Sequence, residues 1–331
     1  MPSLYMTEPG TRLEIEAGRL LCSRGDDVLL AVPAARVDQV VIVTGCHVTT
    51  PAFAFLLDRK IDLLFVTMGG SFRGRLDAGD CGPIELRRAQ YRRGDDPAFC
   101  LALAQAIVAG KIRNARTRCM ELDEGRDPRD ALAIRHLRDA LDAVPGTTAI
   151  TDVMGVEGRA ARWYFSVLRH HLREPWTFRS RQRRPPPDPV NALLSILYTL
   201  LHEQCRTALV AAGLDPAVGY LHQPRAGRLS LALDLMEEFR PVIADAVAWG
   251  MLNKRMLSPQ DFSPASRDGV RLSAEGWRVL ASQYNRRLNT GILVPGRRTR
   301  TTYRKLLEIQ ARHLAGVIAG RQETYEPFRS R

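Results

Sequence analysis

Three separated stretches of the chain combine carboxylates with an imidazole, the groups with which proteins hold metal ions. One stretch carries Glu157, a second ends at His222, and the third carries Asp234 and Glu237 three residues apart. The rest of the chain is strongly basic, with a formal net charge of +12 and a pI of about 9.9. Acidic groups gathered in a basic protein would repel a phosphate substrate unless a cation lay between them. The pattern therefore indicates a divalent ion held where a phosphate backbone is also bound.

The mixture of donor atoms bears on which ion such a site would hold. One imidazole with carboxylate oxygens suits Mg²⁺ or Mn²⁺ better than zinc, which favours thiolates or several imidazoles. An ion of this kind polarises a phosphoryl oxygen and orients or generates an attacking oxygen nucleophile. The residue types thus favour metal-dependent phosphoryl transfer, and they leave Mg²⁺ and Mn²⁺ both open.

Each of these residues has an ordinary explanation when it is taken alone. Glu157 is expected at the start of a helix, where a carboxylate complements the helix dipole. His222 closes a loop, and a single loop histidine is usually structural. Asp234 and Glu237 share a helix face and could form a solvated acidic stripe paired with Arg240. The combination, rather than any one member, carries the metal-site hypothesis.

Arginines are dense on the expected Glu157 helix and in the proline-rich segment after it. Arginine suits bidentate contacts with phosphate, and phosphate contacts supply much of the affinity for DNA. A solvated helix face and linker is the alternative explanation. The residues predicted to contact DNA are Arg159, Arg162, Arg179, Arg181, Arg183 and Arg184.

The composition is that of a globular protein. A chain of 331 residues forms one large domain or two ordinary ones, and 45 % hydrophobic residues is a normal content. No apolar run is long enough to span a bilayer, and the N-terminus lacks a signal-peptide pattern, so a cytoplasmic protein is expected. The six cysteines form no C-x-x-C pair, which excludes zinc-ribbon and thioredoxin-type motifs.

The first 80 residues are predicted to form a small domain of strands. Residues 28–32, 40–43 and 63–66 are continuous apolar runs, typical of strands that are covered on both faces. Between the last two, Thr50 is expected to cap a short helix whose first residue is Pro51. No catalytic cluster occurs here, so a scaffold for dimerisation or partner binding is the simplest role.

The period of the apolar residues becomes helical after this domain. Residues 81–95 are expected to contain a basic linker helix, and residues 96–331 an all-helical catalytic domain. Asp96-Pro97 and Asp188-Pro189 each combine a capping side chain with a proline that fits the first helical position. The fold class predicted is therefore α+β, with a small β-rich N-terminal domain and a larger all-α domain.

Five segments, in order along nearly the whole chain, resemble motifs of the CRISPR spacer-acquisition integrases, the Cas1 family. Residues 154–165 resemble the G-x-E-G-x-A-A-x-x-Y-F helix of that family, and residues 213–222 resemble its G-L-D-P-x-x-G-x-x-H loop. Residues 230–241 contain its D-L-M-E-E-F-R-P helix. Shorter matches are N-A-L-L within residues 189–194 and G-K-I-x-N at 110–114.

The resemblance implies a site and a reaction. It implies a metal held by Glu157, His222 and Glu237. Asp234 would lie beside the site, either as a catalytic acid or as a residue that contacts a ligand without binding the metal. Some members have aspartate at the position of Glu237, which leaves Asp234 as an alternative direct ligand. The reaction implied is attack of a DNA 3′-hydroxyl on a phosphodiester of the repeat array, or cleavage when water attacks.

The resemblance also implies an assembly. Members work on double-stranded DNA as two homodimers bridged by a dimer of the small adaptation partner Cas2. Tyr164 and Tyr220 lie close in sequence to the proposed ligands, and either could contact DNA or pack in the core.

Two other functions remain open from the residues themselves. A structure-specific, metal-dependent nuclease acting on branched DNA in repair would need the same ligands. A non-catalytic nucleic-acid-binding protein would have the same charge, with its acidic residues only structural.

Overall fold

The computed structural model describes residues 3–43, 45–76, 82–123, 127–182, 185–294 and 300–330. The chain forms two compact units, each assembled from segments that are distant in the sequence. Unit 1 comprises residues 1–80, 182–199 and 254–286, and unit 2 comprises 81–181, 200–253 and 287–331. Two of the arginines predicted to bind DNA, Arg183 and Arg184, lie outside the described residues.

Unit 1 contains the N-terminal strands, which form two four-stranded sheets. One sheet has the order β1-β5-β7-β8, in which the first three strands are parallel and β8 is antiparallel to β7. The other has the order β4-β3-β2-β6. The strands are β1 (Ser3–Met6), β2 (Arg12–Glu16), β3 (Arg19–Arg24), β4 (Asp27–Pro33), β5 (Gln39–Ile42), β6 (His47–Val48), β7 (Asp62–Val66) and β8 (Phe72–Leu76).

The apolar runs of this unit have different environments. Strands β5 and β7 are largely buried, as continuous apolar runs predict, and they contribute to one core with β1 to β3. The expectation is wrong for residues 28–32, because β4 is the edge strand of its sheet. Val28, Leu29 and Leu30 are 59 %, 49 % and 44 % exposed. An edge strand made of apolar residues exposes an apolar surface that another chain can cover.

Helix α1 (Thr50–Asp58) starts one residue earlier than predicted. Its N-cap is Thr49, whose hydroxyl accepts a hydrogen bond from the backbone N–H of Ala52 at 3.4 Å. Pro51 therefore occupies the second helical position, where its missing N–H is equally harmless. Unit 1 also contains the first half of α6 (Pro189–Ala211), the short turn η4 (Pro259–Asp261) and most of α9 (Ala274–Leu288).

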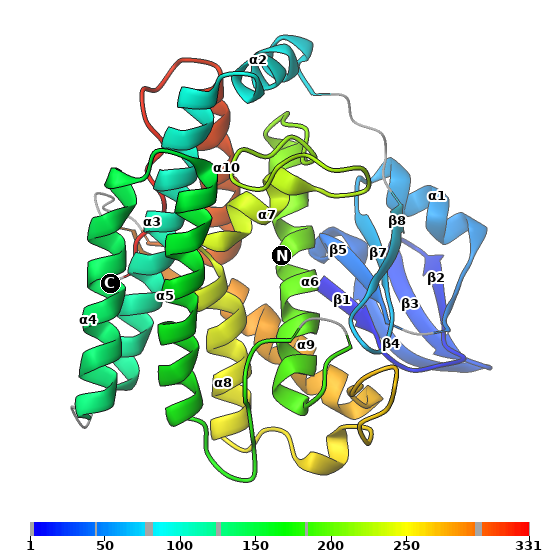
Figure 1. Ribbon diagram of the computed structural model, residues 1–331. Helices are drawn as coiled ribbons and strands as arrows, with labels where there is room; N and C mark the ends of the chain where they lie inside the picture. Colours follow the sequence, from blue (N-terminus) through cyan, green and yellow to red (C-terminus); the bar gives the residue numbers. More distant parts are fainter. Residues whose placement is uncertain are drawn as a thin grey trace. The chain divides into compact units, whose positions relative to one another are not determined.

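Unit 2 is the helical unit, and α3, α4 and α5 pack side by side in it (Figure 1). The predicted fold class, a small β-rich part followed by a larger helical part, is confirmed, although a short pair of strands also occurs near the C-terminus. The elements are α2 (Ile84–Gly94), α3 (Pro97–Leu122), α4 (Pro128–Ala143), η2 (Val144–Gly146), α5 (Ile150–His170), the rest of α6, α7 (Ser230–Glu237), η3 (Arg240–Asp245), α8 (Ala246–Asn253), β9 (Gly291–Leu293), β10 (Arg300–Thr302) and α10 (Tyr303–Ile318).

Local sequence signals set where these helices begin. Asp96 accepts hydrogen bonds from the N–H groups of Ala98 and Phe99, as an N-cap should. Asp188 likewise accepts from the N–H of Asn191 at 2.8 Å. Helix α5 departs from the prediction, since it begins at Ile150, seven residues before Glu157. Glu157 therefore lies beyond the first turn, and the helix dipole does not explain it.

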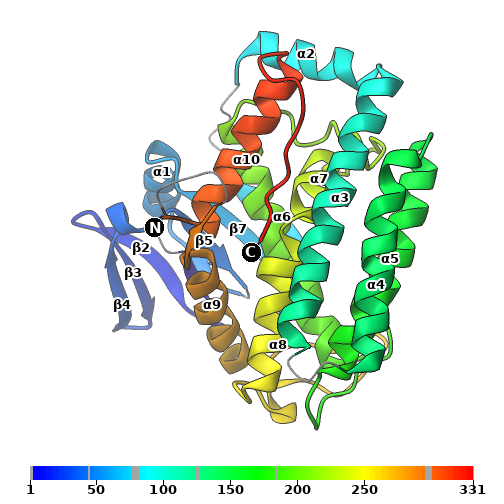
Figure 2. The ribbon, with the colours of Figure 1, turned by 90° about the vertical axis from the view of Figure 1, so that its left-hand side faces the viewer.

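The C-terminal segment returns from α10 to α3 (Figure 2). The amide of Asn114, buried in α3, donates to the carbonyls of Glu238 and Phe328 at 2.8 and 3.0 Å. Its oxygen accepts from the N–H of Ser330 at 2.9 Å. One buried side chain thus joins α3, the end of α7 and the chain terminus. No helix in the described ranges is long and apolar enough to cross a membrane.

Candidate metal-dependent active site

The four acidic and imidazole residues singled out in the sequence come together within unit 2. Glu157 is on α5, His222 ends the loop of residues 213–222, and Asp234 and Glu237 are on α7. Helix α3 adds Lys111, which packs beside them. The site therefore depends on the packing of three helices and one loop, all in the same compact unit.

Lys111 joins the two glutamates. Its Nζ forms an ion pair with Oε1 of Glu157 and lies 2.5 Å from Oε2 of Glu237. The ammonium is only 15 % exposed. Two carboxylates from different helices thus converge on one partly buried cation.

His222 is held by Asp234. The fully buried carboxylate of Asp234 accepts backbone hydrogen bonds from Tyr220, Leu221 and His222 at 2.7, 3.0 and 3.0 Å. It also pairs with Nδ1 of His222 at 2.7 Å. Because an ionised carboxylate only accepts, this pairing places the ring hydrogen on Nδ1. Nε2 is then the free acceptor, 4.0 Å from Oε1 of Glu237.

Glu237 is ionised in this setting although it is buried. Burial raises the pKa of its carboxyl group, but the charges of Arg240 and Lys111 outweigh that effect and lower the pKa to about 2. Nη2 of Arg240 lies 2.9 Å from Oε1 of Glu237. The sequence suggested a solvated acidic stripe as the alternative. Arg240 does pair with Glu237, but Asp234 and Glu237 are buried rather than solvated.

The donor set fits a divalent cation. Oxygens of Glu157 and Glu237 meet at the Lys111 ammonium, and Nε2 of His222 lies 4.0 Å from the other oxygen of Glu237, Oε1. Oε2 of Glu237 is buried, and its described partner is the Lys111 ammonium. Carboxylate oxygens with one imidazole are a donor set that suits Mg²⁺ or Mn²⁺. Asp234 is already saturated by four hydrogen bonds, which suits a residue that orients a ligand.

Comparison with known proteins decides the family. Residues 4–286 match the family described as CRISPR associated protein Cas1. CRISPR-associated endonuclease Cas1 3 of Thermus thermophilus is 38 % identical over 98 % of this chain and 96 % of its own length. CRISPR-associated endonuclease Cas1 1 of Moorella thermoacetica is 34 % identical over 98 % of this chain and 97 % of its own length.

The chain belongs to the Cas1 family. The predicted family membership and the prediction of a CRISPR-associated endonuclease are thereby confirmed.

Solved structures agree on the Cas1 fold. A CAS1 protein from Thermotoga maritima aligns with a TM-score of 0.84 at 21 % identity, over 98 % of this chain and 99 % of that one. A casposase bound to integration product aligns with a TM-score of 0.87 at 20 % identity, over 98 % and 93 %. A chain of a Cas6-RT-Cas1–Cas2 complex aligns with a TM-score of 0.80 at 25 % identity. The alignment covers 98 % of this chain and 36 % of that longer chain.

Two tyrosines near the Cas1 motifs are core residues rather than surface contacts. Tyr164 is buried, and its hydroxyl donates to Oδ2 of Asp245 at 2.8 Å. Tyr220 is also buried, and its hydroxyl donates to the carbonyl of Gln90 at 3.2 Å. Their place in the motifs therefore reflects packing around the site.

The described arginines of the predicted DNA set do not join the acidic site. Arg159, Arg162 and Arg179 are exposed, and Arg181 is half-buried. Successive residues on a helix are about 100° apart, so Arg159 and Arg162 lie about 160° and about 140° around α5 from Glu157. They belong to the solvent face of that helix.

The sequence analysis missed three features of this Cas1 chain. Lys111 lies in the G-K-I-x-N match, and the available signal was a lysine that follows the apolar first half of this helix. Arg240 was treated as a solvated partner. A second cluster, formed by Asp130, His170 and His171, was not noticed, although two adjacent histidines in a chain with seven are conspicuous.

Proposed function

We propose that Glu157, His222 and Glu237 bind Mg²⁺ or Mn²⁺ and that this site transfers phosphoryl groups on DNA during CRISPR adaptation. The observation that carries the proposal is the meeting of the Glu157 and Glu237 carboxylates at one cation, the Lys111 ammonium, with Nε2 of His222 4.0 Å from Oε1 of Glu237. When bound, the ion would supply charge stabilisation at the phosphoryl group and orient the attacking oxygen.

The reaction proposed is a transesterification. The 3′-hydroxyl of a short DNA fragment attacks a phosphodiester of the repeat array, one P–O bond forms and another breaks, and the leaving 3′-oxygen takes up a proton. With water in place of the 3′-hydroxyl, the same exchange is hydrolysis and gives nuclease activity. One structural relative is a casposase bound to integration product.

The protein's own residues have separate tasks in this reaction. Glu157 and Glu237 hold the cation, and Arg240 keeps Glu237 ionised. Asp234 fixes the ring of His222 so that Nε2, not Nδ1, faces the site. A bound cation would take the position of the Lys111 ammonium between the glutamates, and the lysine would then be available to neutralise a phosphate oxygen.

The proposed partners are DNA, the small protein Cas2 and a second copy of this chain. The support for DNA is the basic sequence, with a formal net charge of +12, and the arginines proposed to contact DNA are Arg159, Arg162, Arg179, Arg181, Arg183 and Arg184. The support for Cas2 is the 25 % identical relative, which is a chain of a Cas6-RT-Cas1–Cas2 complex.

A homodimer is proposed to form through the N-terminal domain, taken as residues 1–80. Its support is the edge strand β4, where Val28, Leu29 and Leu30 are exposed. Residues 81–95 would then link this scaffold to the catalytic residues 96–331, and two dimers would assemble with Cas2.

A strand-transfer assay tests the function. Labelled DNA with a free 3′-hydroxyl is incubated with a repeat-containing plasmid, Cas2, and Mg²⁺ or Mn²⁺. We expect joining by the unmodified protein and its loss in Glu157→Ala, His222→Ala and Glu237→Ala, with folding intact. Asp139→Ala, which removes an exposed carboxylate on α4, is the matched control and should retain activity.

Two results would contradict the proposal. Joining at full rate in any of the three variants would remove that residue from the ligand set. Cleavage of branched DNA without any joining, in the presence of Cas2, would favour the structure-specific repair nuclease.

A further inference from the structure

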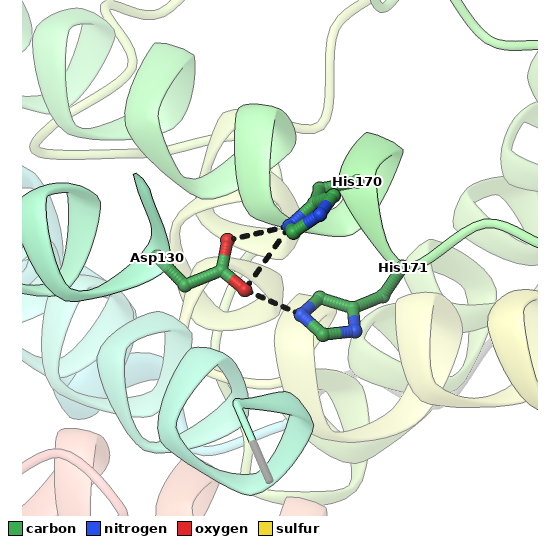
Figure 3. Close-up of side chains that lie close together, drawn as sticks. All are labelled: Asp130, His170 and His171. Carbon is green, nitrogen blue, oxygen red and sulfur yellow. Dashed lines mark hydrogen bonds and ion pairs between the residues drawn. The ribbon is translucent and has the colours of Figure 1, made fainter. Parts of the chain in front are cut away.

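A second cluster of metal-binding groups lies at the junction of α4 and α5. Nδ1 of His170 is 3.1 and 3.2 Å from the two carboxylate oxygens of Asp130, and Nε2 of His171 is 2.5 Å from Oδ2 (Figure 3). One ligand atom from each residue lies within 4.8 Å of the others. Asp130 is only 2 % exposed, whereas both rings are partly exposed.

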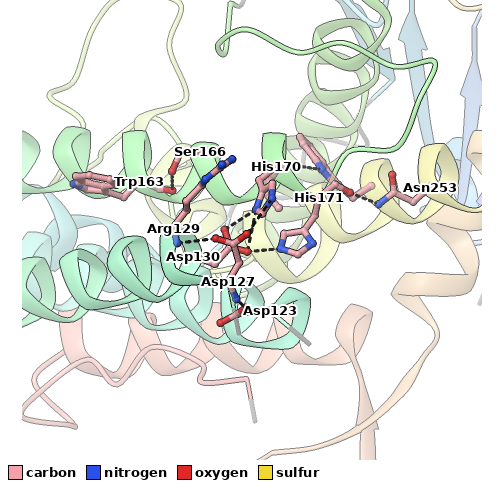
Figure 4. A network of polar contacts seen from close by, with 11 residues as sticks. Asp123, Asp127, Arg129, Asp130, Trp163, Ser166, His170, His171 and Asn253 are labelled. Atoms are coloured by element: carbon pink, nitrogen blue, oxygen red, sulfur yellow. Dashed lines mark hydrogen bonds and ion pairs between the residues drawn. The ribbon is translucent and has the colours of Figure 1, made fainter. Parts of the chain in front are cut away.

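The ends of the two helices bring these side chains together. Asp130 is in the first turn of α4, and α5 ends at His170, with His171 as its C-cap. Adjacent residues inside a helix point about 100° apart, but the chain leaves the helix here, so both rings reach the same carboxylate. Asn253 fixes the path of the chain as it leaves α5. Its side-chain NH₂ donates to the carbonyl of His171 at 2.7 Å, and its side-chain oxygen accepts from the N–H of Arg173 (Figure 4).

This cluster places one buried carboxylate against two imidazoles, a set of groups that can hold a cation. Nε2 of His170 lies 3.6 Å from Oδ2 of Asp127, so its ring stands between two carboxylates. A neutral imidazole carries one N–H and can donate to only one of them. A buried carboxylate such as Asp130 needs a compensating charge, and its described ion pairs are both to histidines. Either added protons or a metal ion would supply that charge.

We propose that Asp130, His170 and His171 form a zinc-class metal site, separate from the active site. The ligands are a carboxylate oxygen of Asp130, Nδ1 of His170 and Nε2 of His171. Asp127 would accept a hydrogen bond from the Nε2–H of His170, as carboxylates commonly do for a metal-bound histidine. Two imidazoles with one carboxylate favour zinc or a similar transition metal over Mg²⁺.

The geometry is close to what such an ion needs. Ligand atoms about 2.0–2.1 Å from a tetrahedral ion lie about 3.3 Å from each other. The separation of His170 and Asp130 already matches this value, and the closer ring of His171 is partly exposed and can withdraw. His170 is 13 residues after Glu157, a distance of about 20 Å along α5. The ion would clamp α4 to the far end of the helix that carries Glu157.

Zinc binding to the whole protein tests the proposal, with His222→Ala as the background so that the active site does not contribute. After equilibrium dialysis against ZnCl₂, we expect one bound equivalent. Adding His171→Ala should weaken zinc binding by more than about 100-fold, since loss of an outer contact alone costs about 10–100-fold. Adding His136→Ala, which removes an α4 histidine that stacks on Trp163, is the control and should change nothing.

The absorption of bound Co²⁺ gives a second readout. A tetrahedral cobalt spectrum in the background protein and the control, absent with His171→Ala or His170→Gln, would support the site. Circular dichroism establishes that each variant is folded before binding is measured. Equal zinc binding with and without His171, or no bound zinc in the background protein, would overturn the proposal and leave a hydrogen-bonded, protonated cluster.

Discussion

Asp234 holds Nδ1 of His222 at 2.7 Å, and this contact determines which ring nitrogen faces the glutamates. The same carboxylate ties down the backbone of residues 220–222 through three N–H groups. A single buried side chain therefore fixes both the loop and the tautomer. This arrangement separates the role of Asp234 from that of Glu237, which pairs with the Lys111 ammonium.

The first prediction concerns Asp234→Asn. An amide can accept through its oxygen, but its NH₂ group would face N–H donors that lose their acceptor. We expect a loss of about 1–3 kcal/mol in the free energy of unfolding. Metal affinity should fall by about 10–100-fold, as for other residues that orient a ligand. Urea denaturation and metal titration measure the two effects.

The comparison with His222→Ala makes this prediction decisive. His222→Ala should lose metal binding with a smaller loss of stability, because the ring is partly exposed and Asp234 keeps its backbone partners. If Asp234→Asn abolishes binding as completely as His222→Ala, Asp234 is itself a ligand.

The second prediction concerns Lys111→Met. In the absence of a metal ion, the ammonium screens Glu157 from Glu237, so its removal should destabilise the protein by about 1–3 kcal/mol. The divalent cation no longer has to displace a competing charge, so the Mg²⁺ concentration for half-saturation should fall severalfold. Lys305→Met, which removes an exposed lysine paired with Glu308, is the control and should alter neither quantity. Weaker Mg²⁺ binding in Lys111→Met would show that the lysine supports the ion instead of competing with it.

The third prediction concerns Tyr164→Phe. The change leaves Asp245 without the hydroxyl donor at 2.8 Å in a buried position, which should cost about 1–3 kcal/mol of stability. Nuclease activity per folded molecule should not change, because the ring is enclosed in the core. Tyr91→Phe is the matched control: its hydroxyl also donates to an aspartate, Asp215, but the ring is 51 % exposed. Its effect should stay within about 0.5 kcal/mol. An activity loss in Tyr164→Phe without a stability loss would place the hydroxyl in the reaction.

Local signals in the sequence were sufficient for most helices and buried strands. Asp96 and Asp188 act through neighbouring N–H groups, so a few consecutive residues contain all the information. The apolar runs of β5 and β7 are likewise buried, as their composition predicts. The misplacement of the α1 cap by one residue reflects two adjacent threonines, Thr49 and Thr50, that a sequence pattern cannot separate.

The remaining features depend on tertiary packing. Strand β4 has the composition of a covered strand, but its position at a sheet edge is decided by which strand pairs with which. Lys111 and Glu157 are 46 positions apart, and only the packing of α3 against α5 reveals their ion pair. Asp130 and the two histidines meet for the same reason, across a separation of about 40 residues. Motif spacing predicted the candidate ligands and could not predict their neighbours.

The last prediction concerns the arginines on the outer face of α5. Replacing Arg159 and Arg162 by alanine removes two exposed guanidiniums that point away from Glu157. If DNA passes over this face, affinity should fall for all sequences alike, and the slope of log affinity against log salt should flatten by about two units. Mg²⁺ binding should not change, since the acidic site lies on the other side of the helix. Fluorescence anisotropy at several salt concentrations measures the slope, and Arg135→Ala with Arg138→Ala on α4 is a control matched in charge. An unaltered slope would show that this part of α5 is a solvated surface, and DNA would then have to follow the segment that begins at Arg179.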